Sequence, residues 1–159
     1  MKEEVAKVSL YSNALMVATS VHHVYGAVVY NTPWRLHILM VSIPVIVFTV
    51  VGNNFLTKRE FVWKNLLLLL YWSMILIFSV ILIGGYEGVY NHALKNVFFF
   101  FGASEPILTK MFPPSMYVMP NNFLFEVTGV MQAVILVPLL VQMAKLSRKL
   151  KGAILALLG

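Results

Sequence analysis

The chain has 159 residues and no cysteine, and 60% of its residues are apolar while only 11% are charged. A soluble domain of this size has no means of burying so much apolar surface, so we expect lipid to cover part of it. The absence of cysteine excludes disulfides, thiolate metal sites and iron–sulfur clusters, and the net charge of +6 does not indicate nucleic-acid binding because the basic residues gather at the ends of apolar stretches.

Four stretches have the length and apolar character of membrane spans, which need about 20 residues each. In chain order they cover about residues 8–30, 36–56, 61–85 and 122–144. We therefore expect an all-α integral membrane protein, a four-transmembrane-helix bundle that forms one domain over residues 1–159.

The first span is the most polar of the four; its polar residues include Ser9, Asn13, Ser20, His22 and His23. We expect these side chains to face the interior of the bundle, because lipid offers them no hydrogen-bonding partner. The same polar interruptions, and the lack of a small-residue cleavage site, favour a membrane span over a cleaved signal peptide.

The Lys and Arg residues near the span ends predict the orientation of the chain. Nine of them fall on one side and three on the other, and the side with more positive charge is the cytoplasmic side. The nine are Lys2, Lys7, Lys58, Arg59, Lys64, Lys145, Arg148, Lys149 and Lys151, and the three are Arg35, Lys95 and Lys110. This predicts a multi-pass protein of the cell membrane with both termini in the cytoplasm. The basic and then apolar segment 146–159 reads as an interfacial helix on the inner leaflet.

The outer connection between the third and fourth spans, residues 86–121, is too apolar for an ordinary loop. It contains the aromatic run Phe98–Phe101 and the turn at Pro113 and Pro114. We expect it to be structured, as an anchor at the membrane surface or as a lid over a pocket.

In this topology every histidine, and both glutamates at membrane depth, lie toward the outer face: His22, His23, His37, Glu87, His92 and Glu126. At 1.5 Å of rise per residue, His22 lies roughly 12 Å below Tyr30, and Glu126 lies roughly 6 Å inside Asn122. These depths allow one shared site. Ionisable residues within a membrane are candidate functional residues by default.

The spacing of these residues refines the prediction. His22 and His23 are adjacent, about 100° apart on a helix, so we expect only one of them to join a cluster. Asn91 is four residues from Glu87, and Asn122 is four residues from Glu126, so each amide could hold its glutamate in place. His92 is five residues from Glu87, and the two side chains converge only if the helix bends or breaks.

The chemistry of the group is that of a metal site or of a proton shuttle. Imidazole and carboxylate suit zinc, iron or copper without any thiolate, and the same groups move protons when they are buried. As metal ligands we propose His22, His23, Glu87, His92 and Glu126, of which Glu87, His92 and Glu126 are also the candidate catalytic residues. Apolar walls would favour an apolar or lipid-like substrate. A haem would need two histidines at matched depth, with His92 as one of them.

Several alternatives remain open from the sequence. Glu126 could form a structural ion pair with Lys95 or Arg35, and His37 could contact lipid headgroups beside Trp34. The whole chain could also be an oligomeric transporter or channel subunit, or a structural subunit of a larger membrane complex. Against transport, the inner halves of the last three spans contain almost no polar residues.

Overall fold

The computed structural model describes residues 1–58, 60, 62–114 and 117–158, with side chains as far as Lys151. All regular secondary structure in this part of the chain is helical. The elements are α1 (Lys2–Val29), the 3-10 helix η1 (Pro33–Ile38), α2 (Leu39–Lys58), α3 (Lys64–Met74), the π-helix η2 (Ile75–Leu94), α4 (Lys95–Phe100), α5 (Glu105–Met111) and α6 (Phe123–Leu158). Arg59 and the predicted start of the third span at Phe61 lie outside the described residues.

Three helical stretches of the described chain are long and apolar enough to cross a membrane: Pro33–Lys58, Lys64–Phe100 and Phe123–Lys151. They correspond to the second, third and fourth predicted spans and indicate a membrane protein. The predicted first span falls within α1, a helix of 28 residues. It is not among the three stretches because its serines, asparagine and histidines lower its hydropathy.

The side chains of α1 divide into two faces. The exposed face is apolar and carries Leu10, Val17, Val21, Val24 and Val28. The buried face carries Ser9, Ser12, Thr19, His22 and His23. A helix at the surface of a water-soluble protein has the opposite arrangement, because α1 turns its polar side toward other helices and leaves apolar side chains exposed.

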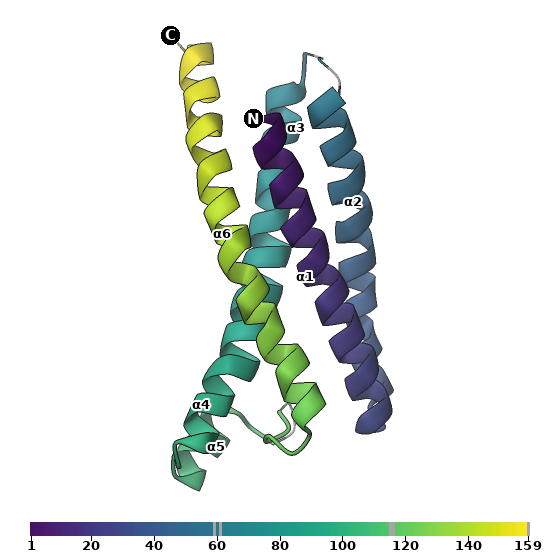
Figure 1. The fold of residues 1–159 in the computed structure, drawn as a ribbon, viewed down its shortest axis with the longest axis vertical. Helices are drawn as coiled ribbons and strands as arrows, with labels where there is room; N and C mark the ends of the chain where they lie inside the picture. The colour runs from purple at the N-terminus through teal and green to yellow at the C-terminus, as the bar shows by residue number, and fades with distance from the viewer. Residues whose placement is uncertain (59, 61, 115–116, 159) are drawn as a thin grey trace.

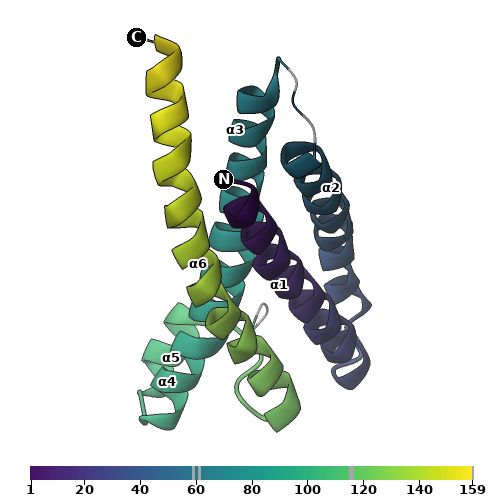
Figure 2. The same ribbon diagram turned by 45° about the horizontal axis from the view of Figure 1, so that its top comes forward.

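The helices form one elongated bundle in which α1 lies between α6 and α2, with α3 and η2 behind them (Figure 1). The turned view shows the same order, with α6 crossing the η2 rod near the end that carries α4 and α5 (Figure 2). Both chain termini lie toward the other end. The core between α1, η2 and α6 is packed with fully buried apolar side chains that include Leu15, Met16, Ile75 and Leu139.

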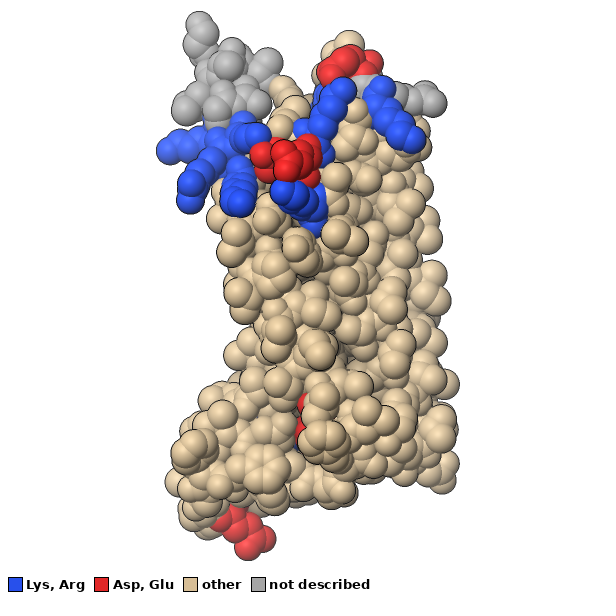
Figure 3. Space-filling view, viewed as in Figure 1, with Lys and Arg blue, Asp and Glu red and all other residues tan. Residues whose placement is uncertain are grey.

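Basic residues gather at the end of the bundle where the termini lie, and most of the visible face below them is uncharged (Figure 3). We call this the basic end, and its Lys and Arg residues are Lys2, Lys7, Lys58, Lys64, Lys145, Arg148, Lys149 and Lys151. We call the opposite end, which carries η1, α4 and α5, the histidine end. The grouping of all eight at one end agrees with the charge asymmetry seen in the sequence.

The third and last helices are longer than predicted. The helical backbone that starts at Lys64 does not stop at Gly85 but runs through η2 and α4 to Phe100. Residues 86–100 of the predicted outer connection are therefore helical, and they carry part of the functional site described below. At the other end, α6 continues without a break to Leu158. Residues 146–158 of the predicted interfacial segment thus belong to the same helix as the fourth predicted span, and the side chains of residues 152–159 lie outside the described residues.

Candidate metal centre

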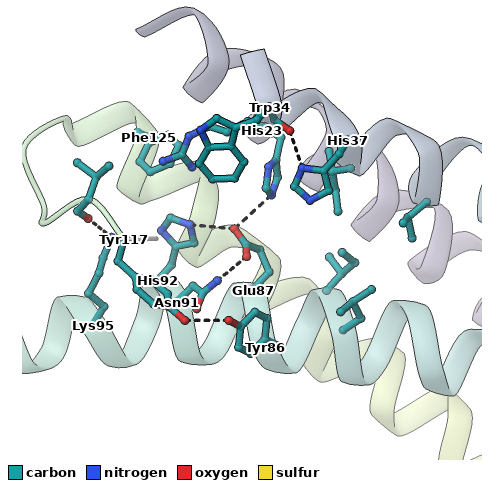
Figure 4. A pocket seen from close by; sticks show the side chains of 16 residues that line it. His23, Trp34, His37, Tyr86, Glu87, Asn91, His92, Lys95, Tyr117 and Phe125 are labelled. Carbon is teal, nitrogen blue, oxygen red and sulfur yellow. Dashed lines mark hydrogen bonds and ion pairs between the residues drawn. The ribbon is translucent and has the colours of Figure 1, made fainter. Parts of the chain in front are cut away.

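Three helices place imidazole and carboxylate groups together at the histidine end. The centre of the group is Oε1 of Glu87, which projects from η2 into the space between η2 and α1 (Figure 4). The Nε2 atoms of three histidines surround this oxygen, at 3.2 Å for His23, 3.5 Å for His92 and 3.9 Å for His22. The side chains of these histidines are at most 7% exposed, and that of Glu87 is 14% exposed. We call Glu87, His22, His23 and His92 the Glu87 cluster.

The π-helical backbone of η2 explains why Glu87 and His92 can meet. In a π-helix the hydrogen bonds join residues five apart, so residues i and i+5 lie one above the other. Glu87 and His92 have this spacing. The sequence predicted that the two side chains converge only if the helix bends or breaks. The wider turn of the π-helix instead brings them to one face of a continuous helix.

Both adjacent histidines of α1 belong to the cluster, so the expectation that only one would join it was wrong. Nε2 of His23 lies 3.2 Å from Glu87 Oε1, and Nε2 of His22 lies 3.9 Å from the same oxygen. The two rings stand edge to face, with centroids 5.3 Å apart. Within the described residues, Nε2 of the buried His22 makes no hydrogen bond. Buried polar atoms are nearly always paired, so this nitrogen is a candidate ligand atom.

A second layer of side chains holds the outward-facing atoms of the cluster. The hydroxyl oxygen of Thr128 on α6 lies 3.0 Å from Nδ1 of His22. The Asn91 amide donates to Oε2 of Glu87 at 2.6 Å, and Oε2 of Glu126 lies 3.1 Å from Nδ1 of His92. Each of these contacts fixes the orientation of a ring or carboxylate and leaves its other polar atom free to face the centre. Such outer contacts are typical of metal ligands.

Glu126 also forms the structural ion pair that the sequence left open. Its Oε1 atom lies 3.1 Å from Nζ of Lys95, a residue only 2% exposed. Lys95 donates a further hydrogen bond of 2.6 Å to the carbonyl oxygen of Val118. Glu126 therefore links His92 to Lys95 and to the segment that precedes α6. It contacts His92 at Nδ1 and is not among the residues grouped around Oε1 of Glu87.

The His92 ring fits against α6 because residue 129 is a glycine. A Cβ atom at Gly129 would lie 2.2 Å from Cγ of His92 and 2.3 Å from its Nδ1. Any side chain there would displace the imidazole. Gly129 lies three residues after Glu126, so the same helical turn provides both the space for the His92 ring and the carboxylate that orients it.

A cavity of about 470 Å³ opens beside the cluster, which is within the usual size range of ligand pockets. Its walls come from α1, η1, α2, η2, α4, the segment before α6, and α6 itself. The lining residues are His23, Trp34, Arg35, His37, Ile38, Val41, Leu82, Ile83, Tyr86, Glu87, Asn91, His92, Lys95, Tyr117, Val118 and Phe125. Burial and a hydrogen bond of 2.8 Å with Tyr86 raise the pKa of Tyr117, so this phenol stays protonated at neutral pH.

The remaining sequence expectations have mixed outcomes. Asn91 supports Glu87 as expected, but Asn122 does not hold Glu126. The Oδ1 atom of Asn122 instead accepts a hydrogen bond from the backbone N–H of Phe125, and this contact caps the start of α6. The same Oδ1 atom accepts a hydrogen bond from the hydroxyl of Tyr25. His37 is exposed, and its Nδ1 donates to the Trp34 carbonyl at 2.6 Å.

Two further residues of the site were not identified from the sequence. Thr128 and Gly129 lie in an apolar stretch of α6, and nothing in their local pattern marks them. Their position three residues or fewer after Glu126 is the signal that could have drawn attention to them.

The edge-to-face contact of the His22 and His92 rings, with centroids 4.5 Å apart, leaves no room for a porphyrin between them.

Comparison of the chain with protein-family models, with curated proteins and with solved structures gives no match. The candidate function therefore rests on the geometry of the site. The described residues that the structure groups as capable of holding a metal ion are His22, His23 and Glu87. Their ligand atoms all lie within 4.8 Å of one another.

Proposed function

We propose that this chain is a membrane-embedded metal-binding protein in which the Glu87 cluster holds one divalent transition-metal ion. The observation that carries the proposal is the spacing around Oε1 of Glu87, which has Nε2 atoms at 3.2, 3.5 and 3.9 Å. Two ligands about 2.1 Å from a tetrahedral zinc ion lie about 3.4 Å apart. The three imidazole nitrogens thus lie at nearly the separation from Glu87 Oε1 that a shared ion would impose, and the ligand atoms of His22, His23 and Glu87 all lie within 4.8 Å of one another.

The donor set narrows the identity of the ion. Three imidazoles and one carboxylate, with no thiolate, suit zinc, iron or copper. Catalytic zinc sites have three protein ligands and keep the fourth position for water or substrate, and four protein ligands leave a position only when the ion becomes five-coordinate. Here the cluster borders the cavity, and His23, Glu87 and His92 contribute to its wall. The proposed function is therefore that of a membrane enzyme or metal-binding protein acting on an apolar or lipid-like substrate, and the metal when bound would supply Lewis-acid or redox chemistry.

The protein's own residues have defined roles in this proposal. His22, His23, His92 and Glu87 bind the ion, while Thr128 and Asn91 orient two of these ligands. The carboxylate of Glu126 accepts the Nδ1 proton of His92, which makes the Nε2 atom the free donor toward the metal. Lys95 stabilises the charged form of Glu126, the form in which the carboxylate accepts this hydrogen bond.

The test is metal content of the protein purified in a mild detergent, stripped with a chelator and then reloaded with zinc, ferrous or cupric ion. We expect roughly one ion per chain, and a higher melting temperature when it is bound. His23→Ala, Glu87→Gln and His92→Ala should each lower the content strongly. His37→Ala is the matched control, because His37 lines the same cavity but binds the Trp34 carbonyl.

Two results would contradict the proposal. One is a wild-type protein that stays folded yet takes up none of the three ions. The other is a loss of metal in His37→Ala equal to that in His23→Ala. The first result would favour proton transfer along Glu87, His92 and Glu126 without a metal, and the second would show that the metal is not held by the Glu87 cluster specifically.

We also propose that α1 crosses the bilayer with the other three helices, so that the chain is a four-span protein of the cell membrane with both termini in the cytoplasm. The apolar outer face and polar inner face of α1 support the fourth span. The alternative of a transporter has less support, because fully buried apolar side chains such as Leu15, Met16 and Leu139 fill the interior between the cluster and the basic end. Assembly as a homo-oligomer or within a larger membrane complex is compatible with the same site.

A further inference from the structure

Arg35 is a buried cation in the cavity wall without a carboxylate partner. It lies in η1, its residue is 6% exposed, and its Nε donates a hydrogen bond of 2.9 Å to the Thr32 hydroxyl. No ion pair joins it to a glutamate within the described residues. The guanidinium instead lies among aromatic rings, with its Cζ atom 5.0 Å from the Trp34 centroid and 5.2 Å from the Phe125 centroid. A buried charge is costly unless it is paired, so Arg35 points to an anion that binds in the cavity.

The same cavity has an apolar arm. Leu82 and Ile83 precede Glu87 by five and four residues on η2, which places them about one helical turn deeper in the bundle. Ile38 and Val41 form the facing wall on η1 and α2. Leu82 is 38% exposed, so the arm opens on the lipid-facing side of the bundle.

A second hollow of about 720 Å³ lies farther along α2, where its lining includes Ile43, Pro44 and Phe48. Its lining contains almost no polar side chain.

We propose that the cavity binds an anionic amphiphile, with a phosphate or carboxylate headgroup on Arg35 and a single hydrocarbon chain in the arm lined by Leu82 and Val41. This inference rests on the proposed function for its location, because the headgroup would lie beside the Glu87 cluster. The Arg35 contact itself requires no metal. Arginine is suited to this role because its planar fork of N–H groups binds phosphate and carboxylate through two hydrogen bonds.

The chemistry of the cavity argues against simpler ligands. A small free anion would satisfy Arg35 but would leave the apolar arm without an occupant. A neutral hydrocarbon would fill the arm but would leave the guanidinium unpaired. Both features are met by one molecule that has the headgroup at one end and the chain at the other.

The experiment measures saturable binding of radiolabelled dodecyl phosphate to the full chain in phosphatidylcholine nanodiscs, with empty nanodiscs as the background. We expect unlabelled dodecyl phosphate to compete with the labelled ligand. Dodecanol should compete at least roughly tenfold more weakly, since it lacks the charge-assisted hydrogen bond, which contributes that factor or more. Inorganic phosphate should also compete at least roughly tenfold more weakly, since it lacks the apolar chain. Equal competition by inorganic phosphate would show a free-anion site, and equal competition by dodecanol would show an apolar site. Either result would overturn the proposal.

Two variants test the two halves of the ligand. Arg35→Gln removes the charge, and Leu82→Trp fills the arm; each should weaken dodecyl phosphate binding about tenfold or more. Their matched controls are Lys110→Gln, an exposed cation on α5, and Ile81→Trp, an exposed neighbour on η2 that does not line the cavity. Unchanged dodecyl phosphate binding in either Arg35→Gln or Leu82→Trp would overturn the proposal. One well-folded variant is therefore enough for the test.

Metal content measured on the same samples separates this proposal from the proposed function. Arg35→Gln and Leu82→Trp should keep their bound metal, because neither residue is a ligand. If the wild type holds no metal but binds dodecyl phosphate through Arg35, the metal site fails and the amphiphile site stands. If the wild type holds metal but shows no saturable dodecyl phosphate binding, the amphiphile site fails alone.

Discussion

Single residues set the tolerances of the Glu87 cluster, and Gly129 shows how tight they are. We predict that Gly129→Ala displaces the His92 ring, because the new Cβ atom would lie 2.2 Å from Cγ of the imidazole. Overpacking of this kind costs roughly 1–3 kcal/mol. Thermal unfolding in detergent should show the loss of stability, and metal content should fall with it.

The control for this change is Gly85→Ala on η2. A Cβ atom there would approach a single backbone oxygen of the same helix at 3.2 Å and would not touch His92. If Gly129→Ala and Gly85→Ala have the same melting temperature and bind the same amount of metal, the close packing of His92 against α6 is not needed by the site.

The types of the site residues could be read from the sequence better than their geometry. Glu87, His92 and Glu126 were identified because charged groups in an apolar stretch have few other uses. That both His22 and His23 lie near Glu87 could not be predicted, because this depends on the position of the Glu87 carboxylate on another helix. Thr128 and Gly129 were missed for the same reason. Their roles exist only in contact with α1 and η2.

At the level of the helices, polar side chains join α1 to its neighbours inside an apolar bundle. The hydroxyls of Ser12 on α1 and Ser79 on η2 lie 2.8 Å apart, and both residues are fully buried. The Thr49 hydroxyl of α2 donates to Asn13 of α1, and the Ser20 hydroxyl donates to that of Ser42 at 2.7 Å. Such contacts connect helices where lipid gives no hydrophobic preference for helix association.

We predict that Ser12 and Ser79 are energetically coupled. A double-mutant cycle with Ser12→Ala and Ser79→Ala should give a coupling energy of about 0.6 kcal/mol, the typical value for hydrogen bonds between membrane helices. Unfolding in mixed detergent micelles provides the measurement. Ser104→Ala, a substitution near the start of α5 and far along the chain from both, is the control partner and should be additive with Ser12→Ala.

The extent of the third helix could not be predicted correctly from the sequence. Its span was predicted over about residues 61–85, but the helical backbone continues to Phe100. In the structure Gly84 and Gly88 face α6, where Cβ atoms would collide with Leu136 and with the backbone at Ala133. A glycine that permits close helix packing and a glycine that ends a helix look the same in a single sequence.

For the molecule as a whole, the distribution of charge predicts the side of the membrane on which each end lies. The chain has no cysteine, so single cysteines can be introduced without a background signal. We predict that a cysteine at Lys2 or Arg148 reacts with a membrane-impermeant maleimide only after the cells are opened. A cysteine at Lys110 of α5 should react in intact cells. Labelling of all three positions from the same side would contradict the four-span topology.

The basic end also gives the folded protein a predictable response to acid. Glu4 of α1 accepts a hydrogen bond of 2.5 Å from Lys149 of α6 and lies 2.7 Å from the N-terminal amine. These contacts, the bond from Lys149 first, lower the pKa of Glu4 from 4.5 to about 2. Because the folded state has the lower pKa, ionised Glu4 stabilises the fold above the unfolded value, and this contribution is lost as the pH falls from 4.5 toward 2.

The corresponding measurement compares the wild type with Glu4→Gln across this pH range. The wild type should melt at a slightly higher temperature near neutral pH, and the difference should disappear below the folded pKa. The effect should be small because the pair is at the surface, and high salt should reduce it. A difference that persists at the acidic limit would mean that the carboxylate charge is not its cause.

The contacts at Gly88 and Gly129 have a consequence for evolution. Substitution at either position is blocked by a neighbouring helix, because Gly129 accommodates the His92 ring and Gly88 accommodates the α6 backbone at Gln132 and Ala133. Homologous proteins that keep the site should therefore keep a discontinuous signature. It consists of a His-His pair, then Glu-Gly-x-x-Asn-His-x-x-Lys, and then Glu-x-Thr-Gly, as at residues 22–23, 87–95 and 126–129. The apolar residues between these three blocks can diverge freely as long as they face lipid, so distant members of such a lineage would be recognisable by this signature after their overall similarity had been lost.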